Sequence, residues 1–218
     1  GIDFKLSTAF KKINKKNDKF DIAIETQQGQ ASEISCDKVL ISIGRKPYTF
    51  GLNLEGIGVK TDDKGFIITE NNFQTSVKNI FAIGDCKQGP MLAHKASEEG
   101  TALAELIVGQ AGHVNFNTIP SVIYTSPEVA SVGKTEEELK SANITYKVGK
   151  FPFTANAKAK VMHKTAGFVK ILSDASSDKV LGVHMIGADV GNMIAELALA
   201  MEFGASSEDI ARTCHAHP

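Results

Sequence analysis

The residues best suited to chemistry lie at the end of the sequence: Cys214, His215, Ala216 and His217. A thiolate and two imidazoles are ligands that zinc accepts, but no second group of ligand residues accompanies them, so a metal site is not expected. A histidine is also a general base near neutral pH, and a carboxylate that orients it makes it stronger. The remaining interpretation is that both histidines lie on a surface loop and have no catalytic role.

A second candidate is the segment 79–85, in which an apolar run is followed by a glycine and a carboxylate. The pattern predicts a buried strand, and ligands of open α/β sheets lie at the carboxyl ends of strands. Gly84 lets a backbone approach a ligand closely, and Asp85 can accept hydrogen bonds from sugar-like hydroxyls. The alternative is that Asp85 only caps a turn.

The third candidate is a group of four residues that open an expected helix: Met91, Leu92, Ala93 and His94. The helix is expected over about 92–108, because alanines and leucines are good helix formers and Gly109 ends it. A helix N-terminus presents free N–H groups and positive potential, which stabilise an anion or an electron-rich ring edge. The alternative is that Met91 and Leu92 fill a core.

The elements expected in the first half of the chain are short strands and irregular segments. Strands are expected over 2–10 and 20–25, where apolar and polar residues alternate. Residues 38–43 are almost continuously apolar, which is typical of a strand buried on both faces of an α/β sheet. Glycines interrupt 48–78, so that stretch is expected to be irregular.

The segment after Pro120 predicts an α+β domain, an antiparallel sheet with helices. The expected strands are 128–132, 144–153, 167–173 and 180–186. Thr135 and Ser206 each precede a carboxylate three residues later, the capping-box pattern that begins a helix. Four apolar residues at helical spacing predict a further helix, which Gly204 ends: Val190, Ile194, Leu197 and Met201.

Composition argues against several classes of function. The 218 residues carry a net charge of −1, so there is no electrostatic case for nucleic acid or an anionic membrane as a partner. No apolar run approaches the roughly 18 residues of a membrane span. The three cysteines are far apart and form no CxxC pair, so a reducing compartment is expected rather than a disulfide framework.

Taken together, these motifs resemble the C-terminal half of the pyridine nucleotide–disulfide oxidoreductases. The resemblance rests on 82–85, 90–96 and 214–218, and on three further stretches, 43–47, 120–130 and 149–153. They follow the family's order and span nearly the whole chain. Each stretch is modest alone, but the combination is specific.

The resemblance implies a fold that is α/β and then α+β, in three segments. Residues 1–47 would be the C-terminal part of an NAD-binding domain. Residues 48–117 would be the central region and the returning, second segment of an FAD-binding domain. Residues 118–218 would be an antiparallel-sheet-plus-helices dimerisation (interface) domain, expected to be incomplete at its C-terminus.

The resemblance also implies FAD and NAD as cofactors. Asp85 would bind the ribityl hydroxyls of FAD, and the helix opened by Met91, Leu92, Ala93 and His94 would face the isoalloxazine ring. Gly44 would lie near the nicotinamide of NAD, and Phe10 near its adenosine end.

The second histidine of the family's His-x-His-Pro pattern is its acid/base, so that role would fall on His217, with His215 as support. His217 would take a proton from a dihydrolipoamide thiol and serve the active site of the other subunit. The implied activity is oxidation of protein-bound dihydrolipoamide with NAD⁺, within 2-oxoacid dehydrogenase complexes.

The implied partners are a second copy of the chain, the subunit-binding domain of a dihydrolipoamide acyltransferase, and lipoyl domains. The implied location is the bacterial cytoplasm or the mitochondrial matrix.

The sequence also departs from the family pattern. The redox-active Cys-x4-Cys pair and both GxGxxG fingerprints are absent from these residues, and the carboxylate that orients His217 would come after the last residue. We therefore expect the chain to be a C-terminal piece of the enzyme and to be inactive alone. Two alternatives remain open: another family member, such as a glutathione or mercuric reductase, or a self-associating interface module without activity.

Overall fold

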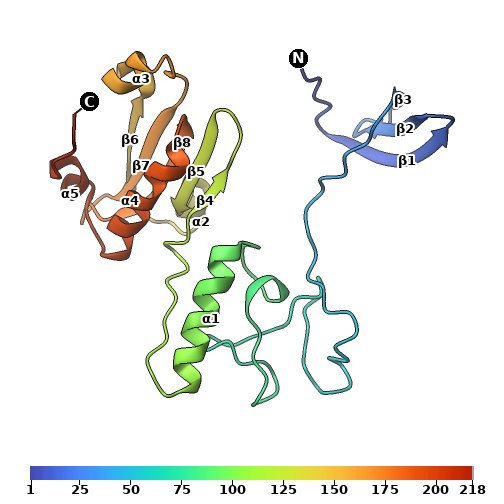
Figure 1. The fold of residues 1–218 in the computed structure, drawn as a ribbon, viewed down its shortest axis with the longest axis horizontal. Helices are drawn as coiled ribbons and strands as arrows, with labels where there is room; N and C mark the ends of the chain where they lie inside the picture. The colour runs from blue at the N-terminus through green and yellow to red at the C-terminus, as the bar shows by residue number, and fades with distance from the viewer. Residues whose placement is uncertain (218) are drawn as a thin grey trace. The chain divides into compact units, whose positions relative to one another are not determined.

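The structure, a computed structural model, describes residues 1–217. The chain divides into two compact units, Gly1–Lys46 and 47–218 (Figure 1). Each unit has its own arrangement of strands and helices.

The first unit is a three-stranded antiparallel sheet in the order β1 (Thr8–Lys16), β2 (Lys19–Thr26) and β3 (Ala31–Cys36). The expected strand over 20–25 is confirmed as β2, whose residues after Lys19 are half-buried. The strand expected over 2–10 is wrong in its position, because pairing begins only at Thr8.

The strand expected over 38–43 is also wrong. This segment forms no strand, and Leu40 and Ile43 are 90% and 91% exposed. A strand buried on both faces needs a paired strand on each side. Among residues 1–217, the structure pairs no strand with this segment, so its apolar side chains stay in contact with solvent.

The second unit begins with a long irregular stretch that is tied together by isolated β-bridges. The strand expected over 79–85 is not formed: Phe81 makes a single bridge to Gln74, and Gly84–Cys86 form a short 3₁₀ helix, η1. Ile80 and Ala82 pack instead into a small cluster with Val59 and Ile67. Their apolar character therefore reflects this cluster and not a sheet.

Helix α1 (Ala93–Ile107) follows, within one residue of the expected bounds at each end. Gly109 has a φ of +81°, a left-handed conformation that glycine adopts without strain and that ends helices. The sequence signals for both the helix and its stop are thus confirmed.

The rest of the second unit is a five-stranded antiparallel sheet with helices. The strand order is β4 (Ser121–Ile123), β5 (Glu128–Gly133), β8 (Val180–Gly187), β7 (Phe168–Asp174) and β6 (Tyr146–Pro152). The four expected strands are confirmed as β5, β6, β7 and β8, and β7 pairs antiparallel with β8. Strand β4 was not expected, nor were η2 (Phe153–Ala155) and the short helix α3 (Ala157–Val161).

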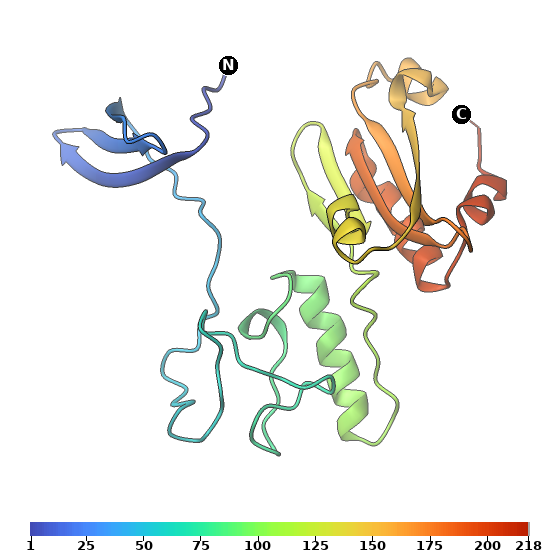
Figure 2. The same ribbon diagram turned by 180° about the vertical axis from the view of Figure 1, so that it is seen from behind.

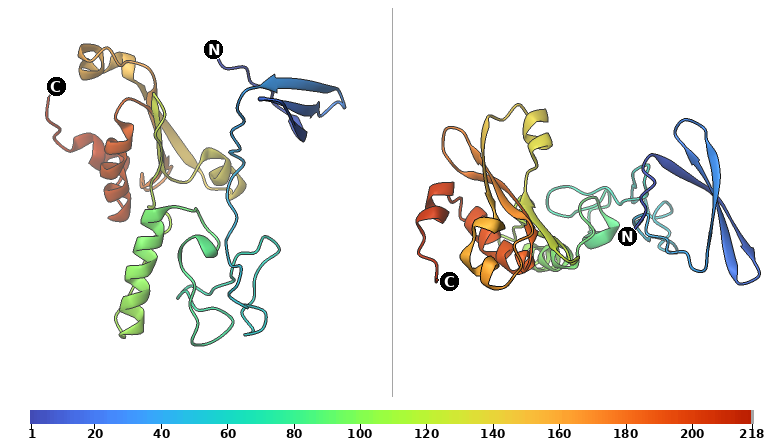
Figure 3. Two further views of the ribbon diagram at one scale, coloured as in Figure 1. Left: turned by 45° about the vertical axis from the view of Figure 1, so that its right-hand side comes forward. Right: turned by 90° about the horizontal axis from the view of Figure 1, so that it is seen from above.

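Helix α4 (Val190–Glu202) packs on one face of this sheet, against β5 and β8 (Figure 3). Its four apolar residues at helical spacing are all buried there, as expected: Val190, Ile194, Leu197 and Met201. Helix α2 (Glu136–Ser141) lies on the opposite face (Figure 2). Helix α5 (Ser207–Arg212) ends the described elements, and α2 and α5 both begin with the expected capping box.

None of the helices formed within residues 1–217 combines the length and the apolar character needed to cross a lipid bilayer.

Candidate functional site

The centre of the candidate site is the turn formed by Gly84 and Asp85. Gly84 has a φ of +71°, and a Cβ added to it would lie 3.3 Å from the Cβ of Ala96 on helix α1. A larger residue would therefore be strained and crowded. Gly84 is buried, whereas Asp85 is exposed at the surface of the same turn.

Three charged side chains lie behind this turn: Lys87, Lys95 and Glu99. Their exposed fractions are 9%, 1% and 0%. Glu99 Oε2 accepts a hydrogen bond from the Gly84 backbone N–H at 2.6 Å, and its Oε1 accepts one from Lys87 Nζ at 3.0 Å. Lys95 Nζ donates to Glu99 Oε1 at 3.2 Å and to the Gly84 carbonyl oxygen at 3.2 Å.

The N-terminus of helix α1 lies a few residues after the turn. Leu92 is the N-cap residue, and neither a capping side chain nor an acidic residue occupies the first helical turn. The first N–H groups of a helix have no acceptors within the helix, so they give this end a positive potential. Met91 and Leu92 are half-buried, and Ala93 and His94 are exposed.

His94 also anchors this helix end. Its Nε2 lies 2.8 Å from the carbonyl oxygen of Pro120, which can only accept, so the ring donates its Nε2–H. The contact joins the start of α1 to the segment that leads into β4. A second link runs from the loop after α1 to α4, where Glu202 Oε2 accepts hydrogen bonds from Thr118 and Asn115. The Thr118 hydroxyl is the main cause that lowers the pKa of Glu202.

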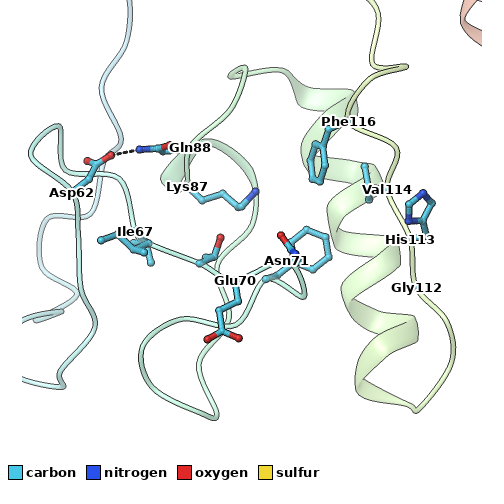
Figure 4. Close-up of a pocket in the computed structure, with 13 residues that line it drawn as sticks. Asp62, Ile67, Glu70, Asn71, Lys87, Gln88, Gly112, His113, Val114 and Phe116 are labelled. Carbon is cyan, nitrogen blue, oxygen red and sulfur yellow. Dashed lines mark hydrogen bonds between the residues drawn. The ribbon is translucent and has the colours of Figure 1, made fainter. Parts of the chain in front are cut away.

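A cavity of about 630 Å³ lies beside the buried charges (Figure 4). Lys87 lines it, and its Nζ lies 5.7 Å from the ring centre of Phe73 and 5.1 Å from that of Phe116. At the other side of the cavity, Asp62 accepts a hydrogen bond from Gln88 at 2.6 Å, which lowers the pKa of Asp62. Neither Asp85 nor the start of α1 lines this cavity, so it is separate from the candidate cofactor contacts.

The terminal histidines behave differently from each other. His215 Nε2 lies 2.6 Å from Glu196 Oε1, and its Nδ1 lies 2.7 Å from the carbonyl oxygen of Thr213. Both neighbouring oxygens can only accept, so the two bonds together require the doubly protonated ring. The carboxylate, with the carbonyl as second cause, raises the pKa of His215. His217 is exposed, and the structure records no partner for it within residues 1–217.

Within residues 1–217, the structure brings together no three histidine, cysteine, aspartate or glutamate side chains that could hold a metal ion. Cys214 is exposed and unpaired, and Cys36 and Cys86 are free thiols.

The two residues expected to contact NAD lie in the first unit. Phe10 is on strand β1, opposite Ile24, and its side chain is 60% exposed. Gly44 follows the sheet in an irregular segment and has a φ of +101°. Gly44 belongs to no strand of this three-stranded sheet. The structure does not test the expected contacts with NAD, so the role of both residues stays a prediction.

Sequence reasoning missed the buried charges behind the turn and the partner of His215. Lys95 and Glu99 are four residues apart on a helix, a spacing that usually places an ion pair in solvent. The small residues around them, Gly84 and Ala96, were the available signal that this helix face lies against another segment. Nothing in the sequence linked His215 to Glu196, because the two are joined only by the packing of α4 and the terminal segment.

Comparison with known proteins assigns both parts of the chain to one family. Residues 1–100 match the pyridine nucleotide-disulphide oxidoreductase domain. Residues 119–218 match the dimerisation domain of the pyridine nucleotide-disulphide oxidoreductases.

Curated relatives are similar along the whole chain. Dihydrolipoyl dehydrogenase from Trypanosoma brucei brucei is 55% identical over 198 residues, which are 90% of this chain and 41% of the relative. The mitochondrial dihydrolipoyl dehydrogenases of Mus musculus and Homo sapiens are each 53% identical over 100% of this chain and 43% of their own length. The chain thus spans less than half the length of these relatives.

Solved structures show the same fold at lower identity. LpdA from Mycobacterium tuberculosis superposes with a TM-score of 0.85 at 23% identity, over 97% of this chain and 45% of that one. The HOCl-induced flavoprotein disulfide reductase RclA from Escherichia coli gives a TM-score of 0.82 at 22% identity, over 96% and 48%. With two matched domains, close relatives along the whole chain and a shared fold, the chain belongs to the pyridine nucleotide-disulphide oxidoreductase family.

Proposed function

We propose that the chain is the C-terminal part of a dihydrolipoyl dehydrogenase, which oxidises protein-bound dihydrolipoamide with NAD⁺ as the acceptor. The observation that carries this proposal is the 53–55% identity to enzymes of that name along the chain. A glutathione or mercuric reductase has no such support among these relatives. This family uses FAD and NAD, and we propose both as cofactors of the full-length enzyme.

The residues around Gly84 fit a flavin. The left-handed glycine lets the backbone come close to a ligand, and the exposed carboxylate of Asp85 can accept hydrogen bonds from ribityl hydroxyls. The uncapped start of α1 offers positive potential to an electron-rich ring. When bound, FAD would carry electrons between the dithiol and the nicotinamide.

The proposed roles of this chain's residues are binding, orientation and proton transfer. Asp85 would bind the ribityl chain, and Met91, Leu92, Ala93 and His94 would set the helix end that faces the flavin. Phe10 and Gly44 would contact NAD. His217 would hold the proton that a dihydrolipoamide thiol gives up, because a neutral imidazole is a base at physiological pH.

His215 would support this proton transfer. Its contact with Glu196 ties the terminal segment to helix α4, two residues before His217, and its contact with the Thr213 carbonyl oxygen lies within that segment. A base must be held within hydrogen-bond reach of the proton it removes. The His215 anchor is therefore proposed to restrict where His217 can lie.

We also propose the domains, partners and cellular location of the chain. Residues 1–47 would belong to the NAD-binding domain and 48–117 to the central region and FAD-binding domain. Residues 118–218 would form the interface of a homodimer, which the dimerisation-domain match supports. The acyltransferase subunit-binding domain and lipoyl domains would be further partners. The mammalian relatives are mitochondrial, so we propose the mitochondrial matrix, with the bacterial cytoplasm as the alternative.

A direct test of the flavin site is FAD affinity in the full-length enzyme with Asp85→Asn. Losing hydrogen bonds to a charged acceptor is expected to raise the dissociation constant of FAD about tenfold or more. Asp63→Asn, a change to an exposed aspartate in the preceding loop, serves as the control and should leave the affinity unchanged. Equal FAD affinity in the Asp85 variant and the wild type would remove Asp85 from the site.

A further inference from the structure

The buried charges behind the Gly84–Asp85 turn have no part in the proposed reaction. Glu99 is 0% exposed and Lys95 is 1% exposed. Moving charges out of water costs free energy, and apolar residues of similar volume often stabilise a fold as well as a buried ion pair does. A contribution to stability therefore does not explain why these residues are charged. Their hydrogen bonds to Gly84 indicate a different role.

The cluster holds both backbone groups of one residue. Glu99 accepts the Gly84 N–H at 2.6 Å, and Lys95 donates to the Gly84 carbonyl at 3.2 Å. Both side chains project from α1, one turn apart, and they also bind each other through Nζ and Oε1 at 3.2 Å. The turn is thus fixed to the helix by charge-assisted hydrogen bonds, which are shorter and stronger than neutral ones.

Lys87 completes the arrangement from the turn's own side. Its Nζ lies 3.0 Å from Glu99 Oε1, and it also faces the rings of Phe73 and Phe116. Two lysines and one carboxylate leave a net charge of +1. The electron-rich faces of the Phe73 and Phe116 rings attract the Lys87 ammonium group, which also borders the cavity. Among the described residues, no buried side-chain nitrogen or oxygen lacks a hydrogen-bond partner.

We propose that Glu99 is a positioning residue for the flavin site. With Lys95 and Lys87 it locks the Gly84–Asp85 turn onto helix α1, so that the proposed ribityl-binding carboxylate and the flavin-facing helix end form one rigid unit. This inference rests on the proposed function. It goes beyond that function because Glu99, which is not proposed to touch the cofactor, would hold the Gly84–Asp85 turn and the start of α1 in a fixed arrangement.

The test compares FAD binding by the full-length enzyme, wild type and Glu99→Gln. The amide keeps the shape of the side chain but removes the charge that faces two lysines, so the dissociation constant of FAD should rise about tenfold or more. The matched control is Glu98→Gln, a neighbouring exposed glutamate on the same helix. The control should stay within about twofold of the wild type, as exposed substitutions usually do.

A second variant separates positioning from plain stability. Lys87→Met, Lys95→Met and Glu99→Leu together replace all three buried charges by apolar side chains, so no buried charge is left unpaired and the unfolding temperature should lie closer to the wild-type value than that of Glu99→Gln. The Gly84 N–H then has no acceptor, so FAD affinity should remain as weak as in Glu99→Gln. FAD affinity that recovers together with stability would overturn the inference, as would wild-type affinity in Glu99→Gln. Failure of the wild type itself to bind FAD would overturn the proposed function instead.

Discussion

At the scale of single residues, hydrogen-bond partners shift the pKa values of two groups near the C-terminal segment, His215 and Asp178. His215 is held between a carboxylate and a carbonyl, both of which require a donor. Asp178 accepts hydrogen bonds from the Ser207 hydroxyl and the Glu208 N–H, which lower its pKa. These contacts tie the terminal helix α5 and the segment after it to the rest of the unit, and their strength depends on pH.

The first prediction concerns the pKa of His215. Its pKa is raised above the usual 6.5, chiefly by Glu196, so this contact stabilises the fold fully below about pH 6.5. The contribution is lost as pH rises through the higher pKa of the folded state. We expect Glu196→Gln to bring the His215 pKa back toward 6.5, as followed by NMR titration of the ring protons.

The control for that titration is Glu137→Gln, which removes an exposed carboxylate from α2. It should leave the His215 titration unchanged. An unchanged His215 pKa in Glu196→Gln would show that the ion pair does not form in solution.

Residue-scale signals in the sequence were reliable where the cause is local. Thr135 and Ser206 cap their helices because each accepts from an N–H three residues later, and that needs no distant partner. The link from His215 to Glu196 and the burial of Glu99 depend on packing between segments far apart in the chain. No local pattern encodes such contacts, so these supporting residues could not be predicted.

At the scale of elements, the predictions that held rest on a regular spacing of apolar residues. Helix α4 was predictable because its four apolar residues repeat at helical spacing and all face β5 and β8. The runs 38–43 and 79–85 were apolar without a period, and such runs fit a buried strand or a local cluster equally well. In the structure, Ile80 and Ala82 pack into a local cluster, whereas most large apolar side chains of 38–43 are exposed.

The second prediction compares two leucines of α4. Leu197 is 7% exposed and packs in the core, whereas Leu199 is 61% exposed. Leu197→Ala should lower the free energy of unfolding by about 2–5 kcal/mol, because it leaves a cavity against the sheet. Leu199→Ala should change it by less than about 0.5 kcal/mol in the monomer. Urea unfolding at low protein concentration measures both, and equal losses would contradict the packing of α4.

At the scale of the whole molecule, the exposed apolar residues point to association. Leu199 on α4 is 61% exposed, and Phe203, the C-cap residue four positions later, is 83% exposed. They fall inside the region that matches a dimerisation domain. Large exposed apolar groups of this kind are typical of protein–protein interfaces.

The third prediction tests that surface. The wild-type chain should self-associate in analytical ultracentrifugation, and Phe203→Ser should weaken association about tenfold or more, as loss of an aromatic anchor does. Phe50→Ser is the matched control, since Phe50 is 84% exposed but lies outside the dimerisation match. A strictly monomeric wild type, or equal effects of the two changes, would count against a dimer through α4.

The most direct test of the account is NADH formation from dihydrolipoamide and NAD⁺ by the full-length enzyme, with His217→Gln as the variant. The wild type should reduce NAD⁺, and the variant should lose about 10²–10⁴-fold in rate, the usual contribution of a general acid/base. FAD content should be the same in both, because His217 is not among the residues proposed to bind FAD. No NADH from the wild type, or full activity in the variant, would contradict the assignment.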